Sequence, residues 1–409
     1  MKFLYLDAVM FWIKLIFFVG LAITFYSYIG YGMLLYVWLK LKRIVNRVHK
    51  DPVSEVEAFP FVTIIIAAYN EEDFITKKIE NTLALDYPKE KLKIIFVTDG
   101  STDATPMIAS KFPEIQLLHI NSRKGKIAAM HRAMSFVETP YVIFSDANTI
   151  LNSESIQKIV RHYNNPQVGG VAGEKKVLQS KDNSVAGAGE GLYWKYESFL
   201  KKLDWEFYTV VGAAGELFSI KTDLYEYPGD NVLLDDFIIS LRICQKGYRV
   251  AYEADAFAME TGSSSIKEEQ KRKIRISAGG FQSMYILRDL LNIFKYPKLS
   301  FQYISHRVLR WTLCPLFLPL ILLCNIFIIS SDYSLVYSLI LLLQIIFYAL
   351  AFLGWLFYIN KIRISFLYAP YYFVFINLSL YRGFIRFIKG NQTVLWEKAK
   401  REQARDIVT

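Results

Sequence analysis

Apolar residues gather in long runs at the two ends of the chain, with a mixed polar and apolar region between them. Residues 8–39 are almost wholly apolar, with Lys14 as their only charge, and residues 311–330 and 333–359 form two more such runs. Each run reaches the roughly 20 residues with which an α-helix crosses a bilayer. We therefore predict three membrane spans. The first is expected to be a retained anchor, because a signal peptide has a shorter apolar region and a small-residue cleavage site.

A fourth apolar run, at residues 366–380, is only marginally long enough to span, so it could cross the bilayer, bend back or lie at the interface. Basic residues are dense after the first run and near the C-terminus, whereas the connector at residues 330–334 has none. Because basic flanks stay in the cytoplasm, the central region is expected there and the connector outside. The same rule opposes a full crossing by the fourth run, and the sequence leaves this conflict open. The basic residues concerned are Lys40, Lys42, Arg43, Arg47, Lys50, Lys361, Arg363 and those of the tail at 397–405.

The net charge of +10 narrows the classes of partner. Juxtamembrane Lys and Arg attract anionic headgroups, so membrane lipids account for the excess. No nucleic-acid-binding motif accompanies the charge, and no nucleic acid is expected as a partner. Cys244, Cys314 and Cys324 show neither a disulfide framework nor a metal-ligand spacing.

Short apolar runs alternate with helical patterns in the region between the apolar ends, residues 59–297. This alternation is typical of βαβ units and predicts an α/β fold with a mixed, mostly parallel sheet. Such sheets bind ligands just beyond the carboxyl ends of their strands. Strands are predicted at 61–68, 92–98, 115–120 and 141–145, and helices at 72–85, 104–110 and 126–137.

Polar side chains follow all four of these strands. Any one of them could be only a helix cap, since Asn and Asp are common caps. Together they place carboxylate, amide and ammonium groups on one rim of the sheet, a set suited to a diphosphate bridged by a divalent cation. The residues, in strand order, are Asn70 and Glu71, then Asp99, then Lys126, then Asp146 and Asn148.

Two phosphate-binding motifs are missing from the chain. It has no G-x-x-x-x-G-K-[ST] pattern, and no G-x-G-x-x-G follows the first predicted strand. These absences argue against a P-loop NTPase and a dinucleotide-binding dehydrogenase.

The second half of the central region contains two further candidate stretches. Gly212 and Gly215 lie in VVGAAGELFSIK, which is either a turn before a strand or a place of close approach to a substrate. Asp235 and Asp236 open a predicted helix, where acids favour the helix dipole. One of them could also act as a general base toward an incoming hydroxyl.

Basic and apolar residues then alternate at helical spacing over residues 266–300, just before the second long apolar run. Such a segment is expected to lie along the membrane surface. Its Arg272 and Arg275 could contact lipid headgroups alone or also reach a phosphate leaving group.

Seven motifs stand in order along residues 61–282: AAYNEE, VTDGSTD, RKGKIAAMHRA, FSDANT, GAAGELFSIK, LLDDF and RKIRISAGGFQ. In this order they resemble the membrane-bound family 2 glycosyltransferases with a GT-A fold, the group that includes cellulose, hyaluronan and poly-N-acetylglucosamine synthases. The flanking apolar runs also fit that family. The resemblance implies a nucleotide-sugar donor, a lipid-linked or glycan acceptor, and Mg²⁺ or Mn²⁺ as a cofactor.

On the donor side, the resemblance implies that Asn70 and Glu71 lie near the nucleoside and that Asp99 contacts the base or the ribose. Lys126 would approach the diphosphate. Asp146 and Asn148 match the D-x-D motif of the family, whose role is to bind the metal together with the ribose and diphosphate of the donor.

On the acceptor side, Asp236 matches the acid that serves the family as catalytic base, with Asp235 beside it. Gly215 and Glu216 would lie by the acceptor. Arg275 would lie within reach of the diphosphate.

Two departures from the family pattern matter. The D-x-D motif ends here in Asn148, an uncharged oxygen ligand, so metal affinity is expected to be lower or to depend mainly on Asp146. The Q-x-x-R-W of processive synthases reads Arg272 to Ile276 here, with Arg275 kept and Trp replaced by Ile. This loss of an aromatic residue argues against polymer synthesis.

The sequence thus predicts an inverting, metal-dependent transfer of a sugar from a UDP-sugar to an acceptor hydroxyl, at the cytoplasmic face of a bacterial plasma membrane. The alternatives are a processive polysaccharide synthase coupled to secretion and a catalytically inactive membrane scaffold. A scaffold would be expected to lack the acids at the strand ends, which are present. The expected domains are an anchor at 1–50, the GT-A domain at 51–265, an interfacial segment at 266–300 and a C-terminal region of two or three spans with a basic tail at 301–409.

Overall fold

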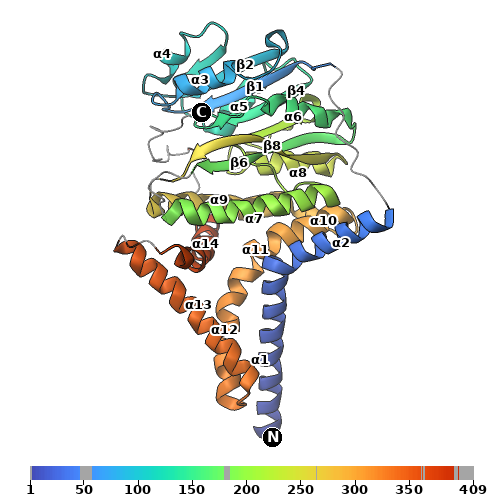
Figure 1. Cartoon of the computed structure of the whole chain (residues 1–409), viewed down its shortest axis with the longest axis vertical. Helices are drawn as coiled ribbons and strands as arrows, with labels where there is room; N and C mark the ends of the chain where they lie inside the picture. The colour runs from blue at the N-terminus through green and yellow to red at the C-terminus, as the bar shows by residue number, and fades with distance from the viewer. Residues whose placement is uncertain are drawn as a thin grey trace.

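The computed structural model describes residues 2–46, 58–178, 185–263, 265–360, 362, 364–390 and 395. These residues form three tiers (Figure 1): a sheet domain, a tier of helices beneath it, and apolar helices that project away from both. Arg47, Lys50, Lys361, Arg363 and the tail at 397–405 lie outside the described residues, so the predictions made on them stay predictions.

The described residues form one eight-stranded sheet with the strand order β3-β2-β1-β4-β7-β6-β8-β5. The pairs β3–β2, β2–β1, β1–β4 and β6–β8 are parallel, and the other three are antiparallel. The expectation of a mixed, mostly parallel sheet is therefore confirmed. The strands are β1 (Val62–Ala68), β2 (Leu92–Asp99), β3 (Gln116–Ile120), β4 (Tyr141–Asp146), β5 (Ile150–Leu151), β6 (Val168–Leu178), β7 (Leu217–Lys221) and β8 (Arg249–Thr261).

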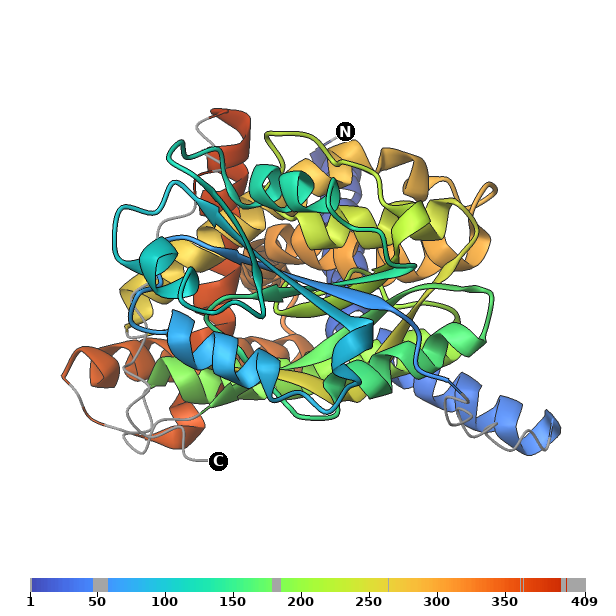
Figure 2. The ribbon, with the colours of Figure 1, turned by 90° about the horizontal axis from the view of Figure 1, so that it is seen from above.

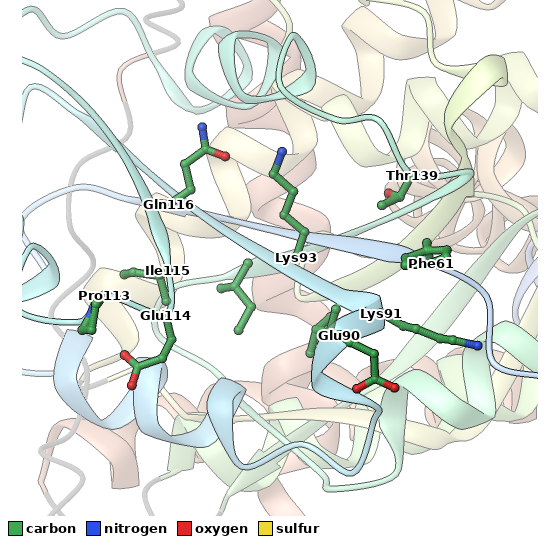
Figure 3. A pocket seen from close by; sticks show the side chains of 11 residues that line it. Phe61, Glu90, Lys91, Lys93, Pro113, Glu114, Ile115, Gln116 and Thr139 are labelled. Carbon is green, nitrogen blue, oxygen red and sulfur yellow. The ribbon is translucent and has the colours of Figure 1, made fainter.

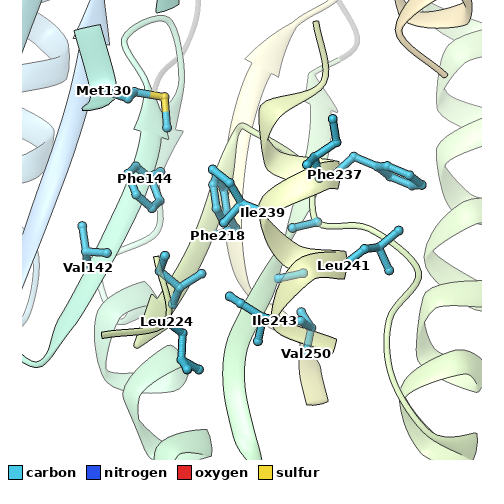
Figure 4. Packing of buried hydrophobic residues seen from close by; sticks show 14 of the residues in the cluster. Met130, Val142, Phe144, Phe218, Leu224, Phe237, Ile239, Leu241, Ile243 and Val250 are labelled. Atoms are coloured by element: carbon cyan, nitrogen blue, oxygen red, sulfur yellow. The ribbon is translucent and has the colours of Figure 1, made fainter. Parts of the chain in front are cut away.

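Helices cover both faces of the sheet, and each face has its own core. On one face Met130 and Ile239 pack toward Phe144 and Phe218, whose rings stack with centroids 4.7 Å apart (Figure 4). All seven residues of β1 are buried, because helices cover it on both sides. The helices on one face are α5 (Lys126–Met134) and α8 (Asp235–Gln245), and those on the other are α3 (Ile75–Leu83), α4 (Thr105–Ala109) and α6 (Ser155–Val160).

The second tier consists of helices that lie flat beneath the sheet (Figure 1). Phe281 of α9 packs on Phe384 of α14, with ring centroids 5.0 Å apart. Helix α14 is short and nearly end-on in Figure 1 but extended in Figure 2, so its axis lies in the plane of this tier. The helices of the tier are α7 (Val185–Phe207), α9 (Ile266–Ile286), α10 (Pro297–Tyr303) and α14 (Ser365–Ile388).

The first apolar run is not one straight helix. Helix α1 (Lys2–Phe25) ends in a π-helical turn at Tyr26–Gly30, after which α2 (Tyr31–Asn46) leaves the axis of α1 and runs beside the second tier (Figure 1). The buried face of α2, with Tyr31, packs on α7. Mean hydropathy does not reveal this turn, because it depends on composition alone.

Three helical segments within the described residues are long and apolar enough to cross a membrane: Asp7–Val45, α12 (Leu313–Ser331) and α13 (Leu335–Ile359). They match the three predicted spans. Helix α14 covers the fourth run and lies in the plane of the second tier, which corresponds to the interfacial alternative.

A buried polar junction joins the second tier to the N-terminal helices. Asp204 of α7 accepts hydrogen bonds from the Tyr31 hydroxyl (2.5 Å) and from Gln302 Nε2 (3.2 Å to the carboxylate), and its other oxygen lies 2.5 Å from His306 Nδ1. Two turns earlier on α7, Glu197 forms an ion pair with Arg307 at 2.5 Å. We call these residues, together with Arg310, the polar junction.

Candidate active site

The carboxyl ends of β1, β2 and β4 meet at one edge of the sheet, as their parallel pairing requires. Strand β4 ends at Asp146, and Lys126 is the first residue of α5. The Lys126 ammonium donates a hydrogen bond to Oδ1 of Asp146 in a close ion pair. Both side chains remain about a quarter exposed, at 26% and 27%, so the pair faces solvent and can be reached by a ligand.

The two acids predicted at a helix start do begin α8. At Gly215, a Cβ atom would stand 3.1 Å from Lys126 Nζ and 3.2 Å from Asp236 Oδ2. The missing side chain therefore leaves room for an ammonium and a carboxylate to approach the same point. Asp235 is buried, and among the described residues no hydrogen-bond partner reaches its Oδ2.

The electrostatics of this cluster suit proton transfer near neutral pH. Burial, together with the adjacent Asp235 carboxylate, raises the pKa of Asp236 to about 7, against the opposing charge of Lys126. Burial acts to lower the pKa of Lys126, but Asp146, Asp235 and Asp236 outweigh it and raise that pKa above its ordinary value. Lys126 is therefore a permanent cation in the site.

Asp99 holds the loop that places Lys126. It is fully buried at the end of β2, and its two carboxylate oxygens accept hydrogen bonds from the backbone N–H of Lys124 and of Gly125, each at 2.8 Å. Gly100 has φ 65°, and a Cβ there would lie 2.8 Å from the backbone nitrogen of Arg123. Sequence reasoning placed Asp99 at the base or ribose, and that direct contact stays a prediction.

Asn70 ties together the loops that follow β1 and β2. Its side-chain oxygen accepts a hydrogen bond from the backbone N–H of Thr102 at 2.8 Å, and its Nδ2 donates to the Thr102 hydroxyl at 3.2 Å. Glu71 is fixed by its backbone N–H, which donates to Thr105 Oγ1 at 2.8 Å. Both residues lie at the predicted edge, and their contact with a nucleoside stays a prediction.

Glu216 belongs to a buried ionic chain that sequence reasoning missed. Its carboxylate lies 2.6 Å from Nζ of Lys175, which is fully buried and also pairs with Glu260. Burial alone would raise the pKa of Glu216, but the Lys175 ammonium lowers it below the ordinary value. Glu216 is therefore held as a carboxylate beside Gly215.

The two arginines of α9 have different surroundings. Arg272 binds Glu269 at 2.9 Å and lies 3.9 Å from Glu260, so it extends the ionic chain of Lys175. Burial lowers the pKa of Arg275, and the charges of Asp235 and Asp146 oppose this effect. The carboxylates of Asp235 and Asp146 therefore favour the charged form of Arg275.

The oxygen ligands at the end of β4 suit a divalent cation that binds together with a diphosphate. Asp146 and Asn148 offer one carboxylate and one amide oxygen, and Mg²⁺ commonly uses one or two carboxylates with phosphate oxygens and water. Within the described residues no group of three or more His, Cys, Asp and Glu side chains could hold a metal alone. The residues therefore fit a cation shared with the nucleotide better than a resident metal.

Lys78 is the second residue of the site region that sequence reasoning missed. It is fully buried on α3, where its ammonium contacts the hydroxyls of Ser145 and Thr149 on either side of Asp146. Burial lowers its pKa to about 7, and the charge of Asp146 opposes this effect. A signal existed in the sequence: Lys78 falls on the same helical face as Ile75, Ile79 and Thr82.

One cavity of the described residues is remote from this cluster. It has a volume of about 470 Å³ and is lined by Lys91, Lys93, Glu114 and Gln116, among others, at the amino ends of β2 and β3 (Figure 3). The cluster of acids lies at the opposite ends of these strands. The cavity is therefore not the site of the chemistry.

Comparison with known proteins agrees with the geometry. Residues 63–227 match the model of glycosyl transferase family 2. Poly-beta-1,6-N-acetyl-D-glucosamine synthase from Staphylococcus aureus (strain MSSA476) is 24% identical over 265 residues, which are 62% of this chain and 62% of that protein. The protein of the same name from Staphylococcus epidermidis is 24% identical over 281 residues, 66% of this chain and 65% of that protein. The match thus spans somewhat less than two thirds of the length of these relatives.

A solved structure shares the fold. The mannosyltransferase PcManGT from Pyrobaculum calidifontis, in complex with GDP-Man and Mn²⁺, superposes with a TM-score of 0.64 at 20% identity. The superposition covers 92% of this chain and 100% of that chain. Residues 63–227 therefore match a glycosyl transferase family 2 domain, and the chain has a GT-A fold.

Proposed function

We propose that this protein is a glycosyltransferase that moves a sugar from a UDP-sugar to a hydroxyl of a lipid-linked or glycan acceptor, with inversion and with a divalent cation. The observation that carries the proposal is the meeting of Asp236, Lys126 and Asp146 beside Gly215. A base with a pKa near 7 stands there next to a cation suited to a diphosphate.

In this proposal Asp236 accepts the proton of the acceptor hydroxyl as its oxygen attacks the anomeric carbon. The new C–O bond forms on the face opposite the diphosphate, whose C–O bond breaks and which leaves with the electron pair. Lys126 and Arg275 offset the negative charge that develops on the leaving diphosphate. Asp235 would accept a hydrogen bond from the hydroxyl of the sugar acceptor at Oδ2, the oxygen that has no partner among the described residues.

Asp146 and Asn148 would hold the cation against the diphosphate. When bound, that cation would neutralise charge on the phosphate oxygens. Asp99, Asn70 and Glu71 would shape the nucleoside end of the donor site through the loops that they fix.

The experiment that tests the donor is a panel of nucleotide sugars offered to the purified full-length protein with Mn²⁺. Release of UDP from one UDP-sugar, lost in Asp236→Asn, is the expected result. Turnover of a GDP-sugar alone would show that the donor is a GDP-sugar, as in the complex of the mannosyltransferase PcManGT, and not a UDP-sugar. Turnover of no nucleotide sugar would contradict the proposed function.

Single addition is proposed over processive synthesis because Ile276 replaces an aromatic residue of the synthase motif. The names of the relatives favour the second candidate, a processive synthase coupled to secretion. Product length separates the two: one added sugar supports a single transfer, and a ladder of oligomers supports a synthase.

For the membrane arrangement, we propose that α1, α12 and α13 cross a bacterial plasma membrane and that the sheet domain is cytoplasmic. Supporting this, the loop between α12 and α13 lacks basic residues. Helices α2 and α14 would lie at the interface, as their orientation suggests (Figures 1 and 2). With α14 at the interface, α13 returns the tail to the cytoplasm and the conflict with the positive-inside rule disappears. Reaction of a Cys placed at Tyr333 with an impermeant thiol reagent in whole cells tests this arrangement, and protection there would contradict it.

A further inference from the structure

Lys78 occupies an unusual place for a lysine. It lies on the buried face of α3 and has no exposed surface, although the ordinary position of an ammonium group is in water. Burying an ammonium is costly unless strong acceptors replace the lost water. The hydrogen-bond partners of this side chain therefore indicate which part of the fold it stabilises.

The acceptors are two hydroxyl groups that bracket the metal-binding motif. Lys78 Nζ donates to Ser145 Oγ at 2.8 Å and to Thr149 Oγ1 at 3.1 Å. Ser145 directly precedes Asp146, and Thr149 directly follows Asn148. A single ammonium thus holds both ends of the segment that carries the two proposed cation ligands.

Both hydroxyls already commit their own protons elsewhere. Thr149 Oγ1 donates to the carbonyl oxygen of Asp146 at 2.9 Å, and Ser145 Oγ donates to the carbonyl oxygen of Glu216 at 3.2 Å. A hydroxyl has only one proton to give, so in this arrangement both oxygens act toward Lys78 as acceptors. An apolar side chain at position 78 would leave two buried acceptors without that donor.

The same contacts reach across to the acceptor side. Through Ser145, Lys78 is connected to the backbone of Glu216, the residue next to Gly215. Gly215 is the point that Lys126 and Asp236 both approach. Hence one buried lysine side chain links the segment at 145–149 with the segment that faces the base.

We propose that Lys78 is a positioning residue that holds the donor-side segment 145–149 and the acceptor-side Gly215-Glu216 segment in register for sugar transfer. The inference rests on the proposed function. It adds a residue that touches neither donor nor acceptor and acts through Ser145 and Thr149.

The test replaces Lys78 with Met, which keeps an unbranched chain but removes the donor. Lys111→Met is the matched control, because Lys111 is exposed. Binding of UDP with Mn²⁺, and of GDP with Mn²⁺ in parallel, is measured by titration calorimetry on full-length protein in detergent. Transfer rates and thermal midpoints are recorded on the same samples.

For Lys78→Met we expect about tenfold weaker binding of the nucleotide with Mn²⁺, the loss that one strong hydrogen bond represents. Transfer should fall by about 10²-fold, since misplacing reacting groups by about 1 Å has that effect. Lys111→Met should match the wild type in both. A purely structural role predicts a lower thermal midpoint with wild-type nucleotide affinity and wild-type transfer per folded molecule, and that result would overturn the inference.

If Lys78→Met does not fold, Ser145→Ala carries the test, since it removes the Lys78–Ser145 hydrogen bond and the connection to Glu216 while the Lys78–Thr149 hydrogen bond remains. A smaller fall in transfer at near-normal stability supports the inference, and unchanged binding and transfer reject it. Failure of the wild type to bind either nucleotide would instead reject the proposed function. The two failures are therefore distinguishable.

Discussion

Replacing Asp236 with Asn tests the proposed base most directly. The substitution keeps the shape of the side chain and an oxygen for the contact with the backbone N–H of Phe237, which lies 2.8 Å from Oδ1. It removes the group that accepts a proton. General-base catalysis contributes about 10²–10⁴-fold in rate, so kcat should fall by that factor, equivalent to about 3–5 kcal/mol.

The pH profile gives a second, independent signature. Because the pKa of Asp236 is raised to about 7, the fraction in the basic form falls from about one half at pH 7 to about one tenth at pH 6. For the wild type, kcat/KM should thus decline roughly tenfold per pH unit below 7 and level off above it. The residual activity of Asp236→Asn should lack this step.

The assay is release of nucleoside diphosphate from the donor identified in the nucleotide-sugar panel, with Asp223→Asn as a control. Asp223 is an exposed acid outside the site, so the same substitution there should leave kcat unchanged. Affinity for the nucleotide should be similar in all three proteins. Wild-type turnover by Asp236→Asn, or an unaltered pH step in its residual activity, would refute the assignment of the base.

Three further outcomes are expected. Gly215→Ala should lower kcat/KM by at least tenfold, because the new Cβ would stand 3.1 Å from Lys126 Nζ and 3.2 Å from Asp236 Oδ2; unchanged kinetics would mean that the two groups do not meet there. EDTA should abolish transfer and Mg²⁺ or Mn²⁺ should restore it, whereas full activity in the chelator would remove the metal from the mechanism. Phe144→Ala should destabilise the domain by about 3–5 kcal/mol in thermal or denaturant unfolding, since Phe144 is buried against Phe218. Phe136→Ala, at a ring that is 42% exposed, should have a much smaller effect, and equal losses would contradict the packing argument.

The regular first half of the central region was predictable because its patterns are local. Helices α3 to α5 and strands β1 and β3 fall within the predicted ranges, and β2 and β4 each extend one residue further, to Asp99 and Asp146. Short apolar runs and helical periodicity are local patterns of adjacent residues, so they predict such elements well. The edge at which Asp146 and Lys126 meet follows from the parallel pairing alone. The ion pair between them was not predicted and is a finding of the structure.

Other features depended on contacts between distant segments and could not be predicted. The turn at Tyr26–Gly30 leaves hydropathy unchanged, so the first apolar run read as one long helix. The burial of Lys175 depends on partners far along the chain. The helical face of Lys78 could be read from the sequence, but its hydroxyl partners, Ser145 and Thr149, could not. The sequence also did not predict that the backbone N–H groups of Lys124 and Gly125 donate hydrogen bonds to the carboxylate of Asp99.

The polar junction limits how the protein can be dissected. Cutting the chain to free the sheet domain from α1, α2 and the C-terminal helices would strip Asp204 and Glu197 of Tyr31, His306 and Arg307. A buried charge deprived of its partner typically costs about 3–5 kcal/mol, a large share of the stability of a domain. Water-soluble fragments of this enzyme should therefore misfold or aggregate, and biochemistry on it belongs in detergent or nanodiscs with every helix retained.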